Sequence, residues 1–208
     1  MLGLEPSTGR TRWSYPLPKP KLTNVPTPIA LSDNRLLLSG QGCDGTRMLV
    51  IELVEGEERV KELWVQRKAQ FFYTNWATDG QAAYGFTGNG GKRLTALSLL
   101  DGKILSQDMG QTDAQVVCDG KQLLLVRSDG VVSLANTTAD GIEADLKAQP
   151  LKDRCWAAPT IVDDTVILRT ATEITRFPLA KLSKDFKPPV DSGVSALDAA
   201  YGQPSGKK

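Results

Sequence analysis

The polar positions of the chain gather in short turn-like clusters that separate short apolar or alternating runs. Most clusters contain the dipeptide Asp-Gly, which occurs six times: Asp44-Gly45, Asp79-Gly80, Asp101-Gly102, Asp119-Gly120, Asp129-Gly130 and Asp140-Gly141. Asn89-Gly90 is a further pair of the same kind. Such pairs favour the positive-φ turns that join antiparallel strands. The pattern therefore predicts a hairpin-rich, all-β fold.

A unit of two runs around one turn recurs along the chain. Its four copies are residues 29–38, 76–84, 116–125 and 160–168. The marker residues Asp33, Asp79, Asp119 and Asp163 lie 46, 40 and 44 positions apart. A repeat of about 40–45 residues made of short strands is typical of β-propeller blades. We expect about four blades, and therefore a partial propeller.

Further strands are predicted after each copy. Third strands are expected at residues 48–53, 93–98, 131–135 and 173–179, and fourth strands in some copies, at 62–66 and 103–107. Four antiparallel strands per unit is the usual blade. Residues 57–70 also place Val60, Leu63 and Trp64 at helical spacing. The repeat context favours a strand at 63–66 instead.

Three segments resemble a known family. Residues 3–13 (GLEPSTGRTRW) resemble the signature that ends a blade in pyrroloquinoline-quinone-like, or quinoprotein-type, β-propellers of bacteria. Residues 96–105 (ALSLLDGKIL) form a second copy, with Ser106 where the Trp would stand. Residues 154–159 followed by 174–179 are similar to the last blade of bacterial members. The resemblance covers about residues 2–182 and implies a propeller fold.

The chain departs from this family in its blade number. Only four blades are readable, whereas the family usually closes with seven or eight, and residues 3–13 form a last strand without earlier strands. One interpretation is that the chain is the C-terminal part of a longer protein, and we favour it. The alternative is that residues 9–14 pair with the last blade, which lacks its own fourth strand, and close a small ring.

The four Trp residues are expected to differ in role. Within the signature, a large ring packs between neighbouring blades, so Trp13 and Trp64 are predicted to be interblade packing residues. Trp76 and Trp156 are candidates for stacking against a ligand, with burial in the core as the favoured interpretation.

Two segments lie outside the repeat. Residues 183–208 are rich in Lys, Pro, Ser, Gly and Asp, with one weak helical run at 195–201, and are predicted to be a flexible polar tail after a propeller domain of residues 1–182. The Pro-rich residues 16–28 are predicted to be an extended loop between blades rather than a proline-recognition ligand.

The composition excludes several kinds of catalytic site, metal site and partner. The 208 residues contain no His, so Ser-His-Asp and Cys-His catalysis and imidazole-based metal sites are excluded. Balanced charge, 25 Lys+Arg against 24 Asp+Glu, argues against nucleic acid as a partner. No apolar run is long enough to span a membrane, and the N-terminus does not read as a signal peptide. Cys43, Cys118 and Cys155 allow at most one disulfide, with buried free thiols favoured.

These observations favour a non-catalytic binding or scaffold module with a protein partner. Within the family, the outer-membrane β-barrel assembly lipoprotein is such a protein. The alternative is a fragment of a quinone-dependent dehydrogenase, whose resemblance implies a calcium-held quinone, a catalytic Asp, a vicinal Cys-Cys disulfide and a stacking Trp. No two Cys are adjacent here, and no acidic cluster has the spacing of a calcium loop. A two-carboxylate hydrolase is a third option.

We therefore predict no enzymatic activity and assign no catalytic, cofactor-binding or metal-binding residue and no cofactor. The resemblance implies a periplasmic or cell-surface location.

Overall fold

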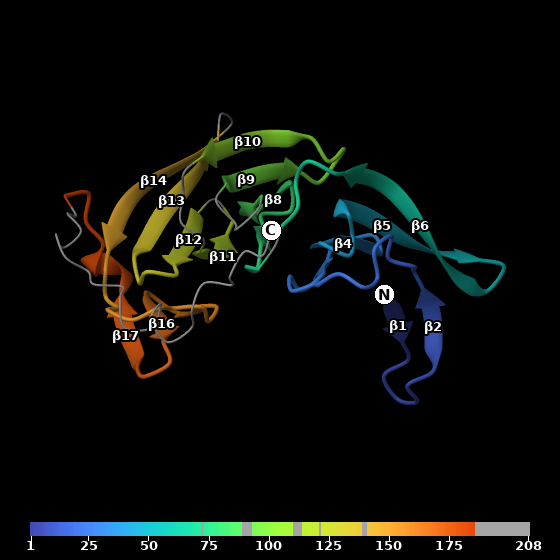
Figure 1. Ribbon diagram of the computed structural model, residues 1–208, viewed down its shortest axis with the longest axis horizontal. Coiled ribbons are helices and arrows are strands. Elements are labelled where there is room, and N and C mark those ends of the chain that lie inside the picture. The colour runs from blue at the N-terminus through green and yellow to red at the C-terminus, as the bar shows by residue number, and fades with distance from the viewer. Residues whose placement is uncertain (72, 89–92, 110–113, 121, 139–140, 186–208) are drawn as a thin grey trace, which may run out of the picture.

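A computed structural model describes residues 1–71, 73–88, 93–109, 114–120, 122–138 and 141–185. The turn at Asn89-Gly90, residue Asp140 and nearly all of the predicted tail lie outside the described residues. Five sheets follow one another along the chain. In Figure 1 they form an open arc, with β6, β10 and β14 along the outer edge.

Three sheets are complete four-stranded antiparallel blades. The first blade contains β3 (Ile29–Ala30), β4 (Arg35–Gly40), β5 (Gly45–Val54) and β6 (Glu57–Gln66). The second contains β7 (Ala77–Thr78), β8 (Ala82–Thr87), β9 (Arg93–Ser98) and β10 (Ile104–Met109). The third contains β11 (Ala114–Asp119), β12 (Gln122–Arg127), β13 (Val132–Thr138) and β14 (Gly141–Ala148). The predicted all-β propeller with four-stranded blades is confirmed.

The fourth blade has three strands: β15 (Thr160–Val162), β16 (Thr165–Arg169) and β17 (Ile174–Pro178). A 3₁₀ turn, η1 (Leu179–Lys181), follows, and Ser183 then pairs with Lys147 at the edge of the third blade. Among the described residues, no helix has the length and apolar character needed to cross a membrane.

The N-terminal segment corrects two expectations. Residues 3–13 are not one strand but parts of a hairpin in which β1 (Leu2–Leu4) pairs with β2 (Thr11–Ser14). The alternative that residues 9–14 complete the last blade is therefore wrong. The reason is local: the Glu5 N–H donates to the Arg10 carbonyl (2.8 Å) and the Gly9 N–H to the Glu5 carbonyl (2.8 Å), so the turn brings β2 back onto β1.

The turns follow the sequence pattern. The described Asp-Gly turns connect consecutive strands, and their glycines have positive φ: Gly45, Gly80, Gly102, Gly120 and Gly130. The helical alternative for residues 57–70 is wrong. Glu55 (φ 53°) and Gly56 (φ 82°) form a hairpin turn, and β6 begins directly after it.

Each neighbouring pair of sheets is held together by its own apolar cluster. Leu37 and Met48 of the first blade meet Ala83 and Leu97 of the second. Similar clusters join the second blade to the third and the third to the fourth. The Pro-rich residues 16–28 contain no strand, as predicted, and the Thr27 carbonyl accepts a hydrogen bond from Trp76 Nε1 (2.8 Å).

A buried charge reinforces the contact between the N-terminal hairpin and the first blade. Arg47 on β5 is buried, forms an ion pair with Glu62 on β6, and donates from Nη1 to the Tyr15 hydroxyl (3.2 Å). The Tyr15 hydroxyl donates in turn to Glu62 Oε2 (2.6 Å). Because each member of this network is hydrogen-bonded, the charge is tolerated inside the interface.

A β-bulge recurs at one position of the outer strand pairs. The register shifts next to the pairs Gly3↔Trp13, Met48↔Trp64 and Ala96↔Ser106. These pairs place Trp13, Trp64 and Ser106 at equivalent positions, as the sequence signature predicts. A bulge re-aims the outer strand: Trp64 packs on Gly102 of the second blade, and Trp13 lines the space between the hairpin and the first blade.

Candidate functional site

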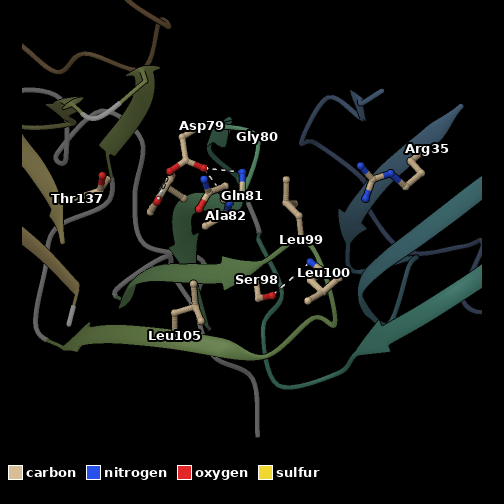
Figure 2. A pocket seen from close by; sticks show the side chains of 11 residues that line it. Arg35, Asp79, Gly80, Gln81, Ala82, Ser98, Leu99, Leu100, Leu105 and Thr137 are labelled. Carbon is tan, nitrogen blue, oxygen red and sulfur yellow. Dashed lines mark hydrogen bonds between the residues drawn. The ribbon is translucent and has the colours of Figure 1, made fainter. Parts of the chain in front are cut away.

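A pocket of about 630 Å³ opens at the second blade. Its lining comes from the β7–β8 turn, the end of β9 and Leu105 on β10, with Arg35 of the first blade and Thr137 of the third completing it. Figure 2 shows Asp79 at the centre of the polar side, with Arg35 reaching in from β4. We call it the blade-2 pocket.

The polar side of the pocket is organised by Asp79. Its Oδ1 accepts hydrogen bonds from the backbone N–H groups of Gln81 and Ala82 (both 2.8 Å), and its Oδ2 accepts one from the Tyr84 hydroxyl (2.7 Å). The following residue, Gly80, has φ +89°, which suits the two-residue turn between the strands. An Asp-Gly pair thus forms the turn and anchors one wall of the pocket.

These contacts set the charge states. Burial alone would raise the pKa of Asp79, but the N–H groups of Ala82 and Gln81 and the Tyr84 hydroxyl outweigh it and lower this pKa. Burial, and the bond to Asp79, raise the pKa of Tyr84. Asp79 is therefore ionised and Tyr84 protonated at neutral pH. Both are engaged in holding the turn, so this pair offers a binding wall rather than an acid and a base.

The other side of the pocket is apolar and open. Leu100 is 85% exposed and Leu105 is also exposed, whereas Leu99 beside them is buried in the contact with the first blade. Arg35 lies opposite, with its Nε donating to the Ser32 carbonyl (3.3 Å). Leu100 and Leu105 thus form an exposed apolar surface beside a charged side chain.

A second pocket of about 530 Å³ lies between the N-terminal hairpin and the first blade. Trp13, Leu4 and Leu53 supply its apolar lining, and the Arg12–Glu58 ion pair forms part of its wall. The Trp13 ring lies directly over Gly3, where an added Cβ would come within 2.1 Å of it. Asn34 lines this pocket and Arg35 the other, so one turn separates the two.

The structure separates the four Trp residues as follows. Trp64 is an interblade residue, as predicted: its ring covers Gly102 of the second blade and its Nε1 donates to the Leu99 carbonyl (3.3 Å). Trp13 lies between hairpin and first blade but lines an open pocket. Trp76 is 5% exposed and packs against Phe71, so the ligand-stacking hypothesis for it is wrong and the core interpretation is confirmed. For Trp156 the favoured core interpretation is wrong: this residue is 66% exposed, because it lies in the connection that precedes β15 and not on a strand packed between blades.

The cysteines of the described residues are thiols, and the described acidic side chains do not gather around a common point. Cys43 and Cys155 are buried thiols outside any disulfide, as favoured, and burial raises both pKa values. Cys118 is half-buried, and its Sγ–H donates to the Gly120 carbonyl (3.4 Å). Within the described ranges, no group of three or more Cys, Asp or Glu side chains is placed to hold a metal ion.

The pocket residues were not identified as candidates from the sequence. The sequence predicts only a turn at Asp79-Gly80, and no residue pattern distinguishes the exposed Leu100 from the buried Leu99. The repeat is the sequence feature that could identify the pocket residues. The bulge at a fixed position of the repeat determines which side chains face the neighbouring blade and which face outward.

A family profile described as outer membrane protein assembly factor BamB matches residues 1–107, about half of the chain. Among curated proteins, no sequence matches. The structure is similar to BamB from Moraxella catarrhalis, with 16% identity and a TM-score of 0.48 over 84% of this chain and 65% of that one. The chain thus spans somewhat less than two thirds of that protein's length.

Two further solved structures resemble the chain. The computationally designed Ika8 protein has 11% identity and a TM-score of 0.55, over 84% of this chain and 51% of that one. AztD from Citrobacter koseri has 13% identity and a TM-score of 0.52, over 79% of this chain and 46% of that one. At this identity the likeness concerns the fold alone, and it agrees with an open, partial β-propeller.

Proposed function

The chain belongs to the family of the outer membrane protein assembly factor BamB, and from this premise we propose that it is a non-catalytic propeller module that binds a protein partner in the bacterial cell envelope. Family membership carries the proposal. All residues lining the blade-2 pocket except Thr137 lie inside the matched range. The exposed Leu100 and Leu105 beside Arg35 and Asp79 support a protein-binding role for this surface, because such interfaces combine apolar anchors with a polar rim.

The test is capture followed by a binding measurement. The immobilised chain is exposed to a detergent extract of cell envelopes, captured proteins are identified, and the dissociation constant of the purified partner is measured. We expect Leu100→Glu/Leu105→Glu to weaken binding at least tenfold. Ile174→Glu is the matched control, since the exposure of Ile174 (75%) lies between those of Leu105 (55%) and Leu100 (85%) but Ile174 is on β17. Absence of a specific partner, or equal binding by all variants, would contradict the proposal.

The quinone of the dehydrogenase branch does not fit these residues. No two Cys are adjacent in the sequence, one of the two stacking candidates, Trp76, is buried against Phe71, and the described acidic side chains form no metal-binding group. A titration with pyrroloquinoline quinone and calcium addresses the alternative directly. Saturable binding with quinone-dependent dye reduction would overturn the non-catalytic proposal.

We also propose a periplasmic or cell-surface location, which rests on the family alone. Fractionation of the native organism with an antibody to this chain tests it, and recovery in the cytoplasmic fraction would contradict it.

A further inference from the structure

The fourth blade lacks the outer strand that the other three blades have. In those blades a fourth strand, β6, β10 or β14, pairs antiparallel with the third. In the fourth blade the order is β15-β16-β17, and among the described residues no strand lies on the outer side of β17 (Figure 1). After β17 the chain passes through η1, and Ser183 then pairs with Lys147 of the third blade. Within the described part of the chain, the outer edge of β17 is therefore open.

Two hydrogen bonds fix the alternation of the ladder between β16 and β17. At one end the Thr170 N–H donates to the Glu173 carbonyl (2.9 Å). At the other end the Leu179 N–H donates to the Asp164 carbonyl (2.8 Å). In an antiparallel ladder every second pair exchanges hydrogen bonds, and the residues of the pairs between them turn their N–H and C=O groups away. The two bonds therefore determine which backbone groups of β17 point outward.

Ile174 and Arg176 are the residues whose backbone points outward. They belong to the pairs Arg169↔Ile174 and Ile167↔Arg176, which lie between the hydrogen-bonded pairs of the ladder. Both residues are exposed, and each offers one N–H and one C=O to an added strand. Because these groups belong to the backbone, substitutions of the Ile174 side chain leave them in place. Pro178, the next residue of the alternation, has no N–H, so the edge ends there.

The Arg176 side chain disfavours a second copy of the chain as the occupant of this edge. The residue at the same place of the third blade, Leu134, packs against the fourth blade, whereas Arg176 is exposed and forms no ion pair with a described residue. Two β17 strands paired antiparallel would bring both Arg176 side chains onto one face, directly opposite or one pair apart, where like charges repel. An acidic residue opposite Arg176 would instead form a favourable cross-strand pair. The acidic residues of the blade lie in the turns before and after β16 and not on its strands: Asp163, Asp164 and Glu173.

We propose that an extended segment of the protein partner binds along the outer edge of β17 and becomes the fourth strand of the blade. Its backbone exchanges hydrogen bonds with Ile174 and Arg176, and one of its acidic side chains lies opposite Arg176. The pairing is antiparallel, as it is between the third and fourth strands of the other blades. The proposal rests on the proposed function, since it adds a second contact for the same partner. It specifies the conformation of the segment that binds there and the charge of one of its residues.

The first measurement concerns the free chain. Amide hydrogen exchange followed by NMR should be fast at Ile174 and Arg176 and slow at Thr175 and Phe177, whose N–H groups bond to β16. Slow exchange at Ile174 and Arg176 in dilute solution would mean that another part of the chain covers the edge. Slow exchange that appears only in concentrated solution would mean that a second copy covers it. Either result would overturn the proposal.

The second measurement is an NMR titration of the isotope-labelled chain with the blocked pentapeptide Thr-Val-Glu-Val-Thr. We expect saturable shifts that are largest for the amide signals of Ile174 and Arg176. N-methylation of the Glu removes a hydrogen bond to the edge and should weaken binding at least tenfold. N-methylation of the second Val, whose N–H points away from the edge, should change the dissociation constant less than twofold. Equal effects of the two methyl groups, or no saturable shift, would overturn strand addition.

Variants test the role of charge. Arg176→Glu should weaken binding of the Glu peptide at least threefold and favour the corresponding Lys peptide, Thr-Val-Lys-Val-Thr, because the charge on the edge is reversed. Arg169→Glu is the matched control, since Arg169 is an exposed arginine on the same face but lies on β16, and the preference for the Glu peptide should remain. An unchanged preference in Arg176→Glu would overturn the role of Arg176. The Leu100→Glu/Leu105→Glu chain should bind the peptide as wild type does, so failure of this titration and failure of the capture experiment are separate results.

Discussion

Asp79 gives the stability of the second blade a dependence on pH. Its carboxylate is stabilised by two backbone N–H groups and the Tyr84 hydroxyl, and its pKa is lowered in the folded chain. A group with a depressed folded pKa stabilises the fold above its unfolded pKa, about 3.9 for Asp, and loses that contribution as pH falls through the folded pKa.

We predict that Asp79→Asn lowers the free energy of unfolding by about 1.5–3 kcal/mol at pH 7, the usual contribution of hydrogen bonds to a charged group. The difference from wild type should shrink as the pH falls below about 4, because the wild-type carboxylate then becomes protonated. Urea unfolding at a series of pH values measures this. A difference that stays constant down to acidic pH would contradict the assignment.

Removing the Ser106 hydroxyl is expected to have the opposite effect on the free energy of unfolding. Ser106 occupies the Trp position of the signature, and its Oγ is buried with no hydrogen-bond partner among the described residues. An unsatisfied buried hydroxyl costs about 1–3 kcal/mol, so Ser106→Ala is expected to leave stability unchanged or raise it. Ser98→Ala is the matched control and should be destabilising, since Ser98 Oγ accepts the Leu100 N–H (3.2 Å). Thermal unfolding of both variants distinguishes the two sites.

At the scale of strands and turns, Trp64 and Gly102 form a matched contact between blades. A Cβ on Gly102 would lie 2.6 Å from Trp64 Cε3, so the close approach of ring and turn requires Gly. Gly9 occupies the same place in the N-terminal copy of the signature. It has nearly the same φ, +70° against +71°, but nothing lies within 4 Å of an added Cβ.

The comparison of Gly9 with Gly102 predicts that the same substitution costs different amounts of stability at the two positions. Gly9→Ala should cost only the strain of positive φ, about 1–2 kcal/mol, whereas Gly102→Ala adds the clash with the Trp64 ring, about 1–3 kcal/mol more. In a Trp64→Ala background, the cost of Gly102→Ala should fall to that of Gly9→Ala. Denaturant unfolding of the four variants measures these values. Equal costs for the two glycines in wild type would contradict the interblade role.

The residue types in the turns explain which strands and turns can be predicted from the sequence. The Asp-Gly turns were found because their residues favour positive φ by themselves, and β9 matches its prediction from Arg93 to Ser98. β6 was predicted too short because its turn, Glu55-Gly56, lacks the usual Asn or Asp. The sequence pattern predicts one strand in place of the N-terminal hairpin because β1 is only three residues long. The blade-2 pocket depends on three blades meeting, which no local pattern encodes.

At the scale of the whole molecule, the arc is open, and among the described residues no further sheet follows the fourth blade (Figure 1). The pairs Val126↔Val132 and Arg169↔Ile174 hold equivalent places in the third and fourth blades. Val132 is fully buried against the fourth blade, whereas Ile174 is 75% exposed. Equivalent positions of the repeat thus differ only in whether another sheet covers them.

The same substitution at these two positions should therefore have very different effects. Ile174→Lys is expected to change the free energy of unfolding by less than about 0.5 kcal/mol, as at other surface sites, and to raise the concentration at which the chain aggregates, because it removes an exposed apolar side chain. Val132→Lys should cost more than about 3 kcal/mol, because it buries an unpaired charge. Chemical unfolding and light scattering measure the two quantities. A loss of stability in Ile174→Lys comparable to that in Val132→Lys would mean that this face is covered in solution, and the outward face of β17 would then have to be treated as an interface.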